Sequence, residues 1–300
     1  MVIERGWLSS NSVLFDGRPR GGHGETVIVD TGYWSHQEQT LALVRAALGA
    51  RRLDRIVNTH LHSDHCGGNA LLQRTHGCDV DVPVGERAKV DSWDEARLSY
   101  RDTGQHCPRF RCTGGLAPGE TTVLGGRPWQ LIAAPGHDPE SVVLYEPELR
   151  LLISADALWE NGFGVVFPEI EGAAAFDAVR ATLERIASLP IDWVIPGHGP
   201  PFSGVPAAIE RAVKRLDAFV AAPARHARHA AKVLIKFHLL EVRAKPLAEL
   251  VSWVGAARFM RLLHAQYFAD ADFESWVGAL IQELVQVSVL RAESGSICDA

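Results

Sequence analysis

The chain has 300 residues, of which 47% are hydrophobic and 22% charged, and its formal net charge is −6 at pH 7. This length and composition are typical of one large or two modest folded domains, and they exclude a disordered chain, a collagen-like chain and a small disulfide scaffold. The five cysteines are an odd number at irregular spacings, which indicates reduced thiols. Because neither a secretory signal nor an apolar run of roughly 20 residues is apparent, we expect a soluble, cytoplasmic protein without a membrane partner.

The first two thirds of the chain alternates predicted strands and helices. Short strands are predicted at residues 12–15 and 26–30, joined by a glycine-rich turn over residues 17–24. A one-sided helix is predicted over residues 37–48, which Gly49 ends. Later strands are predicted over residues 55–58, 129–133, 142–145, 151–154 and 193–195. We therefore expect an α/β fold in which functional side chains follow the strand ends.

The charge and the composition change after residue 204. Residues 205–262 carry 11 basic and 4 acidic side chains, whereas residues 1–204 carry 18 basic and 26 acidic ones. Helices are predicted over residues 224–242, 247–254, 257–267 and 273–287, followed by a small hairpin. We predict a first domain over residues 1–222 and a mostly helical, winged-helix-like domain over residues 223–300.

Four residues of metal-binding type lie within six positions, directly after the strand predicted at residues 55–58. On an extended segment His60 and His62 project to the same side, so both imidazoles can reach one ion. Asp64 and His65 come just past the turn and can address a second ion. Three further candidates each follow a predicted strand: His137, Asp156 and His198. A single such histidine is commonly a solvated or hydrogen-bonded residue, but the cluster has no packing reason and indicates a metal site.

This pattern resembles the metallo-β-lactamase superfamily, and within it the glyoxalase II-like branch. The similarity spans about residues 26–204 and includes the turn Asp30-Thr31-Gly32. It implies an αβ/βα sandwich with two metal ions at one edge of the sheets. The ligands implied by the resemblance are His60, His62 and His137 for the first ion, Asp64, His65 and His198 for the second, and Asp156 as the bridge.

The implied chemistry is that of a hydrolase. Two divalent ions, zinc in the first place and iron or manganese otherwise, would share a water molecule and present it as hydroxide. Asp64 is the expected catalytic carboxylate, since it could orient that hydroxide. A thiolate leaving group needs little protonation, which favours a small-molecule thioester of the hydroxyacylglutathione or acyl-CoA type, or a lactone.

The segment over residues 157–168 bears on the substrate. It resembles the glyoxalase II segment in outline but has Val165 where those enzymes typically place a basic residue for glutathione. Its apolar character suggests an acyl or aromatic group, and packing between the two domains explains it equally well. The candidate substrate-binding residues are Trp159, Phe163, Phe167 and Tyr100.

Other functions stay open at this point. The basic stretch over residues 225–232 is compatible with a single-strand ribonuclease of the same fold, although the acidic chain argues against a nucleic-acid partner. A mononuclear iron persulfide dioxygenase would need only two histidines and a carboxylate. A binding protein that has lost turnover would keep the same ligands. The C-terminal domain is expected to shape substrate access or to form the contacts of a homodimer.

Overall fold

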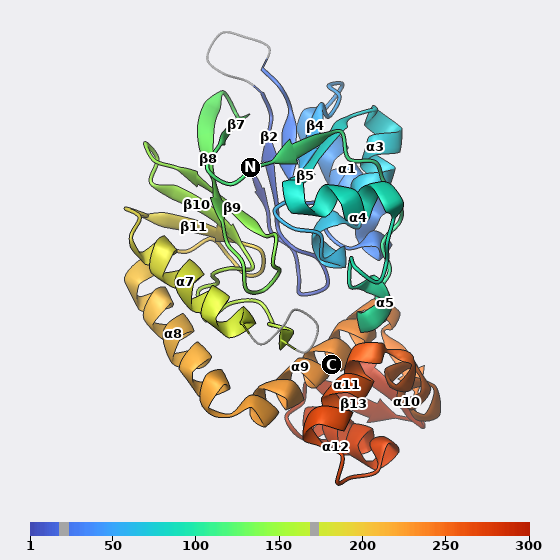
Figure 1. Cartoon of the computed structure of the whole chain (residues 1–300). Helices are drawn as coiled ribbons and strands as arrows, with labels where there is room; N and C mark the ends of the chain where they lie inside the picture. The colour runs from blue at the N-terminus through green and yellow to red at the C-terminus, as the bar shows by residue number, and fades with distance from the viewer. Residues whose placement is uncertain (18–23, 169–173) are drawn as a thin grey trace.

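The computed structural model describes residues 1–17, 24–168 and 174–300, so most of the predicted turn at residues 17–24 lies outside the described residues. Two β-sheets face each other, and helices cover their outer sides (Figure 1). The first sheet has the order β1-β2-β3-β4-β5-β6 and consists of β1 (Val2–Ile3), β2 (Ser12–Phe15), β3 (Val27–Val29), β4 (Arg55–Val57), β5 (Asp79–Pro83) and β6 (Gly114–Leu116). Pairing is antiparallel from β1 to β3 and parallel from β3 to β6.

The second sheet has the order β11-β10-β9-β8-β7. Its strands are β7 (Thr121–Leu124), β8 (Arg127–Ala133), β9 (Val142–Glu146), β10 (Leu151–Ala155) and β11 (Trp193–Pro196). Neighbouring strands pair antiparallel from β7 to β10, whereas β10 and β11 are parallel. As a result β8, β10 and β11 run in the same direction and end at the same edge of the sheet.

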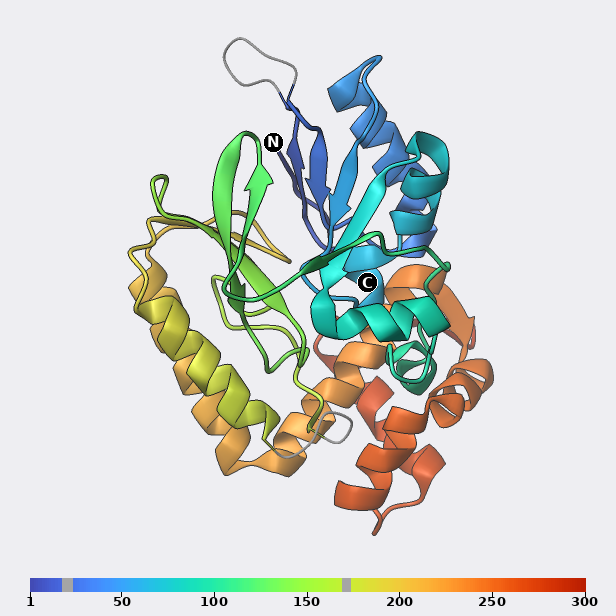
Figure 2. The same ribbon diagram turned by 45° about the horizontal axis from the view of Figure 1, so that its top comes forward.

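Three apolar layers hold this sandwich together. Side chains of both sheets, including Val29, Trp129 and Leu144, form the layer between them. Outside the first sheet lie α1 (Gln37–Leu48) and α3 (Asn69–His76), and outside the second lie α7 (Ala175–Ala187) and α8 (Val205–Ala221). Figure 2 shows the same layers from another side, with the blue and cyan helices outside one sheet and the yellow and orange helices outside the other. The predicted α/β sandwich is confirmed.

Short helices connect several strands: η1 (Trp34–His36), α2 (Ser63–Cys66), η2 (Val84–Glu86), α4 (Arg87–Ser92) and α5 (Tyr100–Thr103). None of these was predicted, because a helix of one or two turns shows too little periodicity to be recognised. The helix α1, in contrast, has the predicted limits and ends at Gly49, whose φ of 63° suits a residue without a side chain.

The C-terminal part contains four helices and a small sheet. The helices are α9 (Pro223–Val242), α10 (Leu247–Ala256), α11 (Arg258–Tyr267) and α12 (Phe273–Gln286). The predicted hairpin is present as β13 (Leu290–Glu293) and β14 (Ser296–Asp299), and β14 also pairs with β12 (Ala244–Pro246). Helices α8 and α9 meet at Ala222, where the two-domain division was placed, and that division stays a prediction. In the described ranges, no helix is both long and apolar enough to span a lipid bilayer.

Candidate metal centre

Three overlapping groups of side chains of metal-binding type lie where the strands end. The groups are His60, His62 and His137; His60, His65 and Asp156; and Asp64, His65 and His198. In each group one nitrogen or oxygen atom per residue lies within 4.8 Å of the others. The structure therefore brings together all seven residues that the sequence singled out.

Strand direction explains this convergence. His137, Asp156 and His198 follow β8, β10 and β11, which end at the same edge of the second sheet. The chain leaves β4 of the first sheet through His60 and His62 and then forms α2. Since the two sheets face each other, these two sets of loops meet between the sheet edges.

The turn that carries α2 needs two adjacent glycines. A Cβ atom on Gly67 would lie 2.3 Å from the backbone nitrogen of Trp34, and one on Gly68 would lie 2.6 Å from the carbonyl oxygen of Thr31. Both distances are far below a van der Waals contact, so no other residue fits without moving the backbone. The two glycines thus let α2 pack tightly against the loop that follows β3.

Hydrogen bonds orient two of the imidazole rings. The Nδ1 atom of His65 lies 2.8 Å from Asp30 Oδ2, and the Nδ1 atom of His137 lies 2.6 Å from the carbonyl oxygen of Val165. Because a carboxylate and a carbonyl oxygen only accept hydrogen bonds, both Nδ1 atoms carry a proton, and both Nε2 atoms face the interior of the centre, where His137 Nε2 lies 2.7 Å from His62 Nδ1. The Nε2 atoms of His60 and His65 are buried and have no hydrogen-bond partner among the described residues.

Electrostatics divides the ligands into two kinds. Burial lowers the pKa of His62 and of His137 to about 4, and it lowers the pKa of His60 well below its ordinary value, so these three rings are neutral near pH 7. Burial also opposes a charge on His65, but Asp156, Asp30 and Asp64 together raise the pKa of His65 above its ordinary value. This side of the centre is therefore rich in negative charge and attracts a cation.

The donor set fits divalent metal ions. Buried imidazole nitrogens without partners are costly unless something binds them, and neutral imidazoles with carboxylates are the ligands of zinc and related ions. Asp156 contacts both halves of the centre, because its Oδ1 lies 3.4 Å from His65 Nε2 and its Oδ2 lies 3.3 Å from His137 Nε2. One carboxylate is thus placed to reach two ions.

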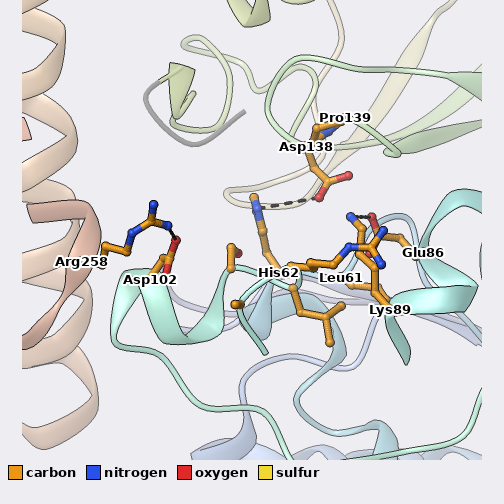
Figure 3. Close-up of a pocket in the computed structure, with 12 residues that line it drawn as sticks. Leu61, His62, Glu86, Lys89, Asp102, Asp138, Pro139 and Arg258 are labelled. Atoms are coloured by element: carbon orange, nitrogen blue, oxygen red, sulfur yellow. Dashed lines mark hydrogen bonds and ion pairs between the residues drawn. The ribbon is translucent and has the colours of Figure 1, made fainter. Parts of the chain in front are cut away.

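Two cavities border the centre on different sides. A polar cavity of about 480 Å³ is lined by His62 and by charged side chains. His62 Nε2 lies 4.0 Å from Asp138 Oδ2, and Figure 3 marks this contact with a dashed line. Two ion pairs in the cavity wall join Lys89 to Glu86 and Arg258 to Asp102. A cavity of about 680 Å³ with mostly apolar walls is lined by His198 and by residues of α8 and α9. We call these the polar cavity and the apolar cavity.

The four predicted substrate-binding residues occupy different places. Trp159 lines the apolar cavity and donates from Nε1 to Asp156 Oδ1 at 3.2 Å. Phe167 is 8% exposed and packs against Phe259 of α11, with its ring 6.4 Å from that of His62. Phe163 and Tyr100 are 1% and 2% exposed and belong to the core, so they lie behind the cavity walls rather than in them.

Tyr100 is buried for a specific reason. Its hydroxyl group donates to the carbonyl oxygen of Leu61 at 2.8 Å, which places the ring beneath the segment that carries His60 and His62. The ring therefore supports the metal-binding segment from the core side. Sequence reasoning could not separate this role from substrate binding, because both leave an aromatic residue near the ligand segment.

Three residues near the centre were not recognised from the sequence in these roles. The Trp7 ring stacks on the His198 ring with centroids 5.4 Å apart and planes 10° apart, although Trp7 itself is 60% exposed. Asp30 orients His65, and only its place in an Asp-Thr-Gly turn gave a signal. Arg215 lines the apolar cavity from α8, where the sequence shows one more basic residue in a basic segment.

Comparisons with known proteins agree with this geometry. A model described as the metallo-beta-lactamase superfamily matches residues 5–198. Hydroxyacylglutathione hydrolase of Hyphomonas neptunium is 29% identical over 169 residues, which are 56% of this chain and 55% of that protein. The same-named enzyme of Methylococcus capsulatus is 30% identical over 173 residues, 57% of this chain and 56% of that protein. The match therefore spans about half the length of these curated relatives.

One solved structure extends the likeness over the C-terminal part. A beta-lactamase domain protein from Burkholderia ambifaria superposes with a TM-score of 0.58 and 21% identity, covering 100% of this chain and 92% of that one. At this identity the likeness concerns the fold alone. The family model covers most of the chain and includes all seven converging residues, and on this evidence the chain belongs to the metallo-beta-lactamase superfamily.

Proposed function

We propose that this protein is a hydrolase that holds two divalent metal ions and cleaves a thioester or a related ester or lactone. The observation that carries the proposal is the set of three overlapping ligand groups at the wall of an apolar cavity. The residues that would hold the first ion are His60, His62 and His137, those for the second are Asp64, His65 and His198, and Asp156 would serve both. Zinc is the proposed metal, because imidazole nitrogens dominate the donor set.

The reaction needs a water molecule, an electrophilic carbonyl carbon and a leaving group. Bound metal ions would lower the pKa of water and polarise the carbonyl group. The water oxygen bonds to the acyl carbon, the carbon–sulfur bond breaks, and the thiol departs with one proton from the water. A thiol has an ordinary pKa of about 8.5, so it can leave without a dedicated acid.

Asp64 is the proposed catalytic carboxylate. Its Oδ2 lies 3.0 Å from His198 Nε2, and its side chain is 14% exposed, so the other ligand residues do not enclose it completely. A carboxylate in this position can accept a hydrogen bond from the attacking water and hold its lone pair toward the carbonyl carbon. His198 lies beside it in the wall of the apolar cavity.

The relatives support a thioester. Two of them bear the name hydroxyacylglutathione hydrolase, and the seven converging residues lie within the matched family model. Val165 stands where the sequence comparison led us to expect a basic residue, and its carbonyl oxygen is engaged by His137. We therefore propose a thioester with an apolar acyl chain and with a thiol part other than glutathione.

The charge pairing of α9 weighs against a ribonuclease. Arg228 and Lys232 both form ion pairs with the single carboxylate of Glu283 on α12, so two cations of the basic stretch at residues 225–232 are engaged within the C-terminal part. A surface that binds single-stranded RNA needs cations that are free to contact phosphates.

Metal content and turnover test the proposal together. Elemental mass spectrometry on the full chain, purified without chelator, should find about two ions per chain, and a panel of acyl thioesters should contain a substrate. His137→Ala should abolish thioester hydrolysis in a folded protein, whereas His106→Ala, at an exposed histidine outside the three groups, should keep it. One iron per chain with oxygen uptake on persulfides would contradict the proposal and favour a dioxygenase.

A further inference from the structure

The apolar cavity has walls of two different kinds. Near the metal centre it is lined by His198, Trp7 and Trp159, whose rings contact one another. It is also lined by apolar side chains of α9 such as Val233 and Phe237. A volume of about 680 Å³ lies in the range of cavities that enclose a small organic ligand. The walls thus suit an apolar chain that begins at the metal centre.

Three cationic side chains also line this cavity, and two of them have a carboxylate partner. Lys232 shares Glu283 with Arg228, and Lys236 shares Asp299 with Arg243. Arg215 pairs with no carboxylate in residues 1–17, 24–168 and 174–300. The only carboxylate in the lining itself, that of Glu160, is exposed.

The contacts of Arg215 leave part of its guanidinium group available. One terminal nitrogen lies 3.0 Å from His229 Nε2, and the other lies 3.4 Å from the carbonyl oxygen of Asn161. The guanidinium carbon lies 5.8 Å from the centre of the Phe163 ring and 5.3 Å from that of Phe219. A guanidinium group has five N–H donors, so these contacts do not exhaust it.

The neutral state of His229 sharpens this picture. Burial and the nearby charge of Arg215 lower the pKa of His229 to about 4, so its ring is uncharged near pH 7. Its Nε2 atom therefore accepts a hydrogen bond from the Arg215 guanidinium group. Aromatic faces and a neutral imidazole offset part of the desolvation free energy of the half-buried guanidinium group, but they do not neutralise its charge. An anionic ligand group would complete the arrangement with charge-assisted hydrogen bonds.

We propose that the apolar cavity binds the acyl part of a thioester that carries a second, terminal carboxylate, and that Arg215 binds this carboxylate. The inference rests on the proposed hydrolase function and specifies its substrate as the monothioester of an aliphatic dicarboxylic acid. The acyl chain lies along the apolar wall, and the thiol part lies on the side of the polar cavity, whose wall is rich in charged groups. Arg215 is a specificity-determining residue in this arrangement.

The test compares two substrates that differ only at the far end of the acyl chain. Octanoyl and 7-carboxyheptanoyl thioesters of N-acetylcysteamine share a neutral thiol, so the terminal carboxylate is the sole difference. Wild-type holoenzyme should prefer the carboxylated substrate. Arg215→Met should lower the ratio of the two kcat/KM values by about 10- to 100-fold, the usual effect of losing a hydrogen-bonded charge partner. Lys214→Met, at an exposed cation of the same helix, should leave the ratio unchanged.

A damaged fold would lower the rate on both substrates, and circular dichroism would reveal it. If Arg215→Met is folded and the ratio of the two kcat/KM values is unchanged, the proposal is overturned. Arg215→Lys provides the second variant: it keeps the charge but loses the planar fork, so the ratio should be intermediate.

Binding separates this inference from the proposed function. Isothermal titration of the full chain with octanedioate and with octanoate needs no turnover, and octanedioate should bind more tightly in the wild type alone. If neither thioester is hydrolysed, the hydrolase proposal fails while the binding comparison still stands. Equal affinity for the two acids, in wild type and in Arg215→Met, would refute the carboxylate site itself.

Discussion

Replacing Asp30 with asparagine tests how the protein positions a metal ligand from outside the ligand set. Asp30 is 3% exposed, and its Oδ2 lies 2.8 Å from His65 Nδ1. The same carboxylate accepts hydrogen bonds from the backbone nitrogen and the hydroxyl group of Thr59, at 3.0 and 2.8 Å. Three donors therefore converge on one carboxylate, and His65 is one of them.

Asparagine keeps the shape of this side chain but offers one acceptor oxygen in place of two. Its NH2 group would face one of the three donors, so at least one hydrogen bond is lost. The backbone should be retained, because Asp30 has a φ of 55° and asparagine tolerates the left-handed region well. Loss of a carboxylate that orients a histidine ligand typically weakens metal binding about 10- to 100-fold, or about 1.4–2.7 kcal/mol.

The assay is a zinc titration of metal-free protein against a chromophoric chelator. Asp30→Asn should bind zinc about 10- to 100-fold more weakly than wild type while keeping its circular dichroism spectrum. Asp54→Asn is the matched control, since Asp54 accepts two hydrogen bonds from Thr26 at 2.8 Å each and lies outside the three ligand groups. Wild-type zinc affinity in Asp30→Asn would refute the argument that this hydrogen bond holds His65 in place.

Three further predictions concern stability and packing. His226 is 1% exposed between two phenylalanine rings, and burial lowers its pKa to about 4; the unfolded state therefore takes up the proton first, and stability falls as pH drops below about 6.5. Between pH 7 and 5 the free energy of unfolding, measured with urea, should fall by about 2 kcal/mol less in His226→Phe than in wild type. The same pH dependence in both proteins would contradict this. A Cβ atom on Gly197 would lie 2.1 Å from Asp156 Oδ1, so Gly197→Ala should weaken zinc binding, whereas Gly278→Ala, in open space on α12, should not. Phe259→Ala, at a fully buried ring, should lower the free energy of unfolding by about 3–5 kcal/mol in the same assay. The exposed-site variant Val123→Ala is the control, and a smaller effect at Phe259 than at Val123 would show that the C-terminal core is loosely packed.

Local sequence patterns were sufficient for about half of the elements and for the ligands. The helix over Gln37–Leu48 and the strand over Ser12–Phe15 have their predicted limits, because one-sided periodicity and flanking glycines act within the element itself. The seven ligand-type residues were recognisable because they lie in segments that follow predicted strands, and strand ends place such segments at a common edge. The sequence analysis did not predict the short helices, the longer helices α3, α7 and α8, or the strands β1, β5, β6, β7 and β12.

The cavities and their charges depend on contacts between distant segments, and no local pattern contains them. The Trp7 ring stacks on the His198 ring, although most of the first two thirds of the chain separates the two residues in sequence. Tyr100 lies in the core, where its hydroxyl group donates a hydrogen bond to the carbonyl oxygen of Leu61. The basic segment at residues 205–262 suggested free cations, yet Glu283 of α12 forms ion pairs with two of them. Composition counts charges along the chain, whereas pairing depends on which side chains packing brings within a few ångströms, and this is why Arg215 could be singled out only in the folded protein.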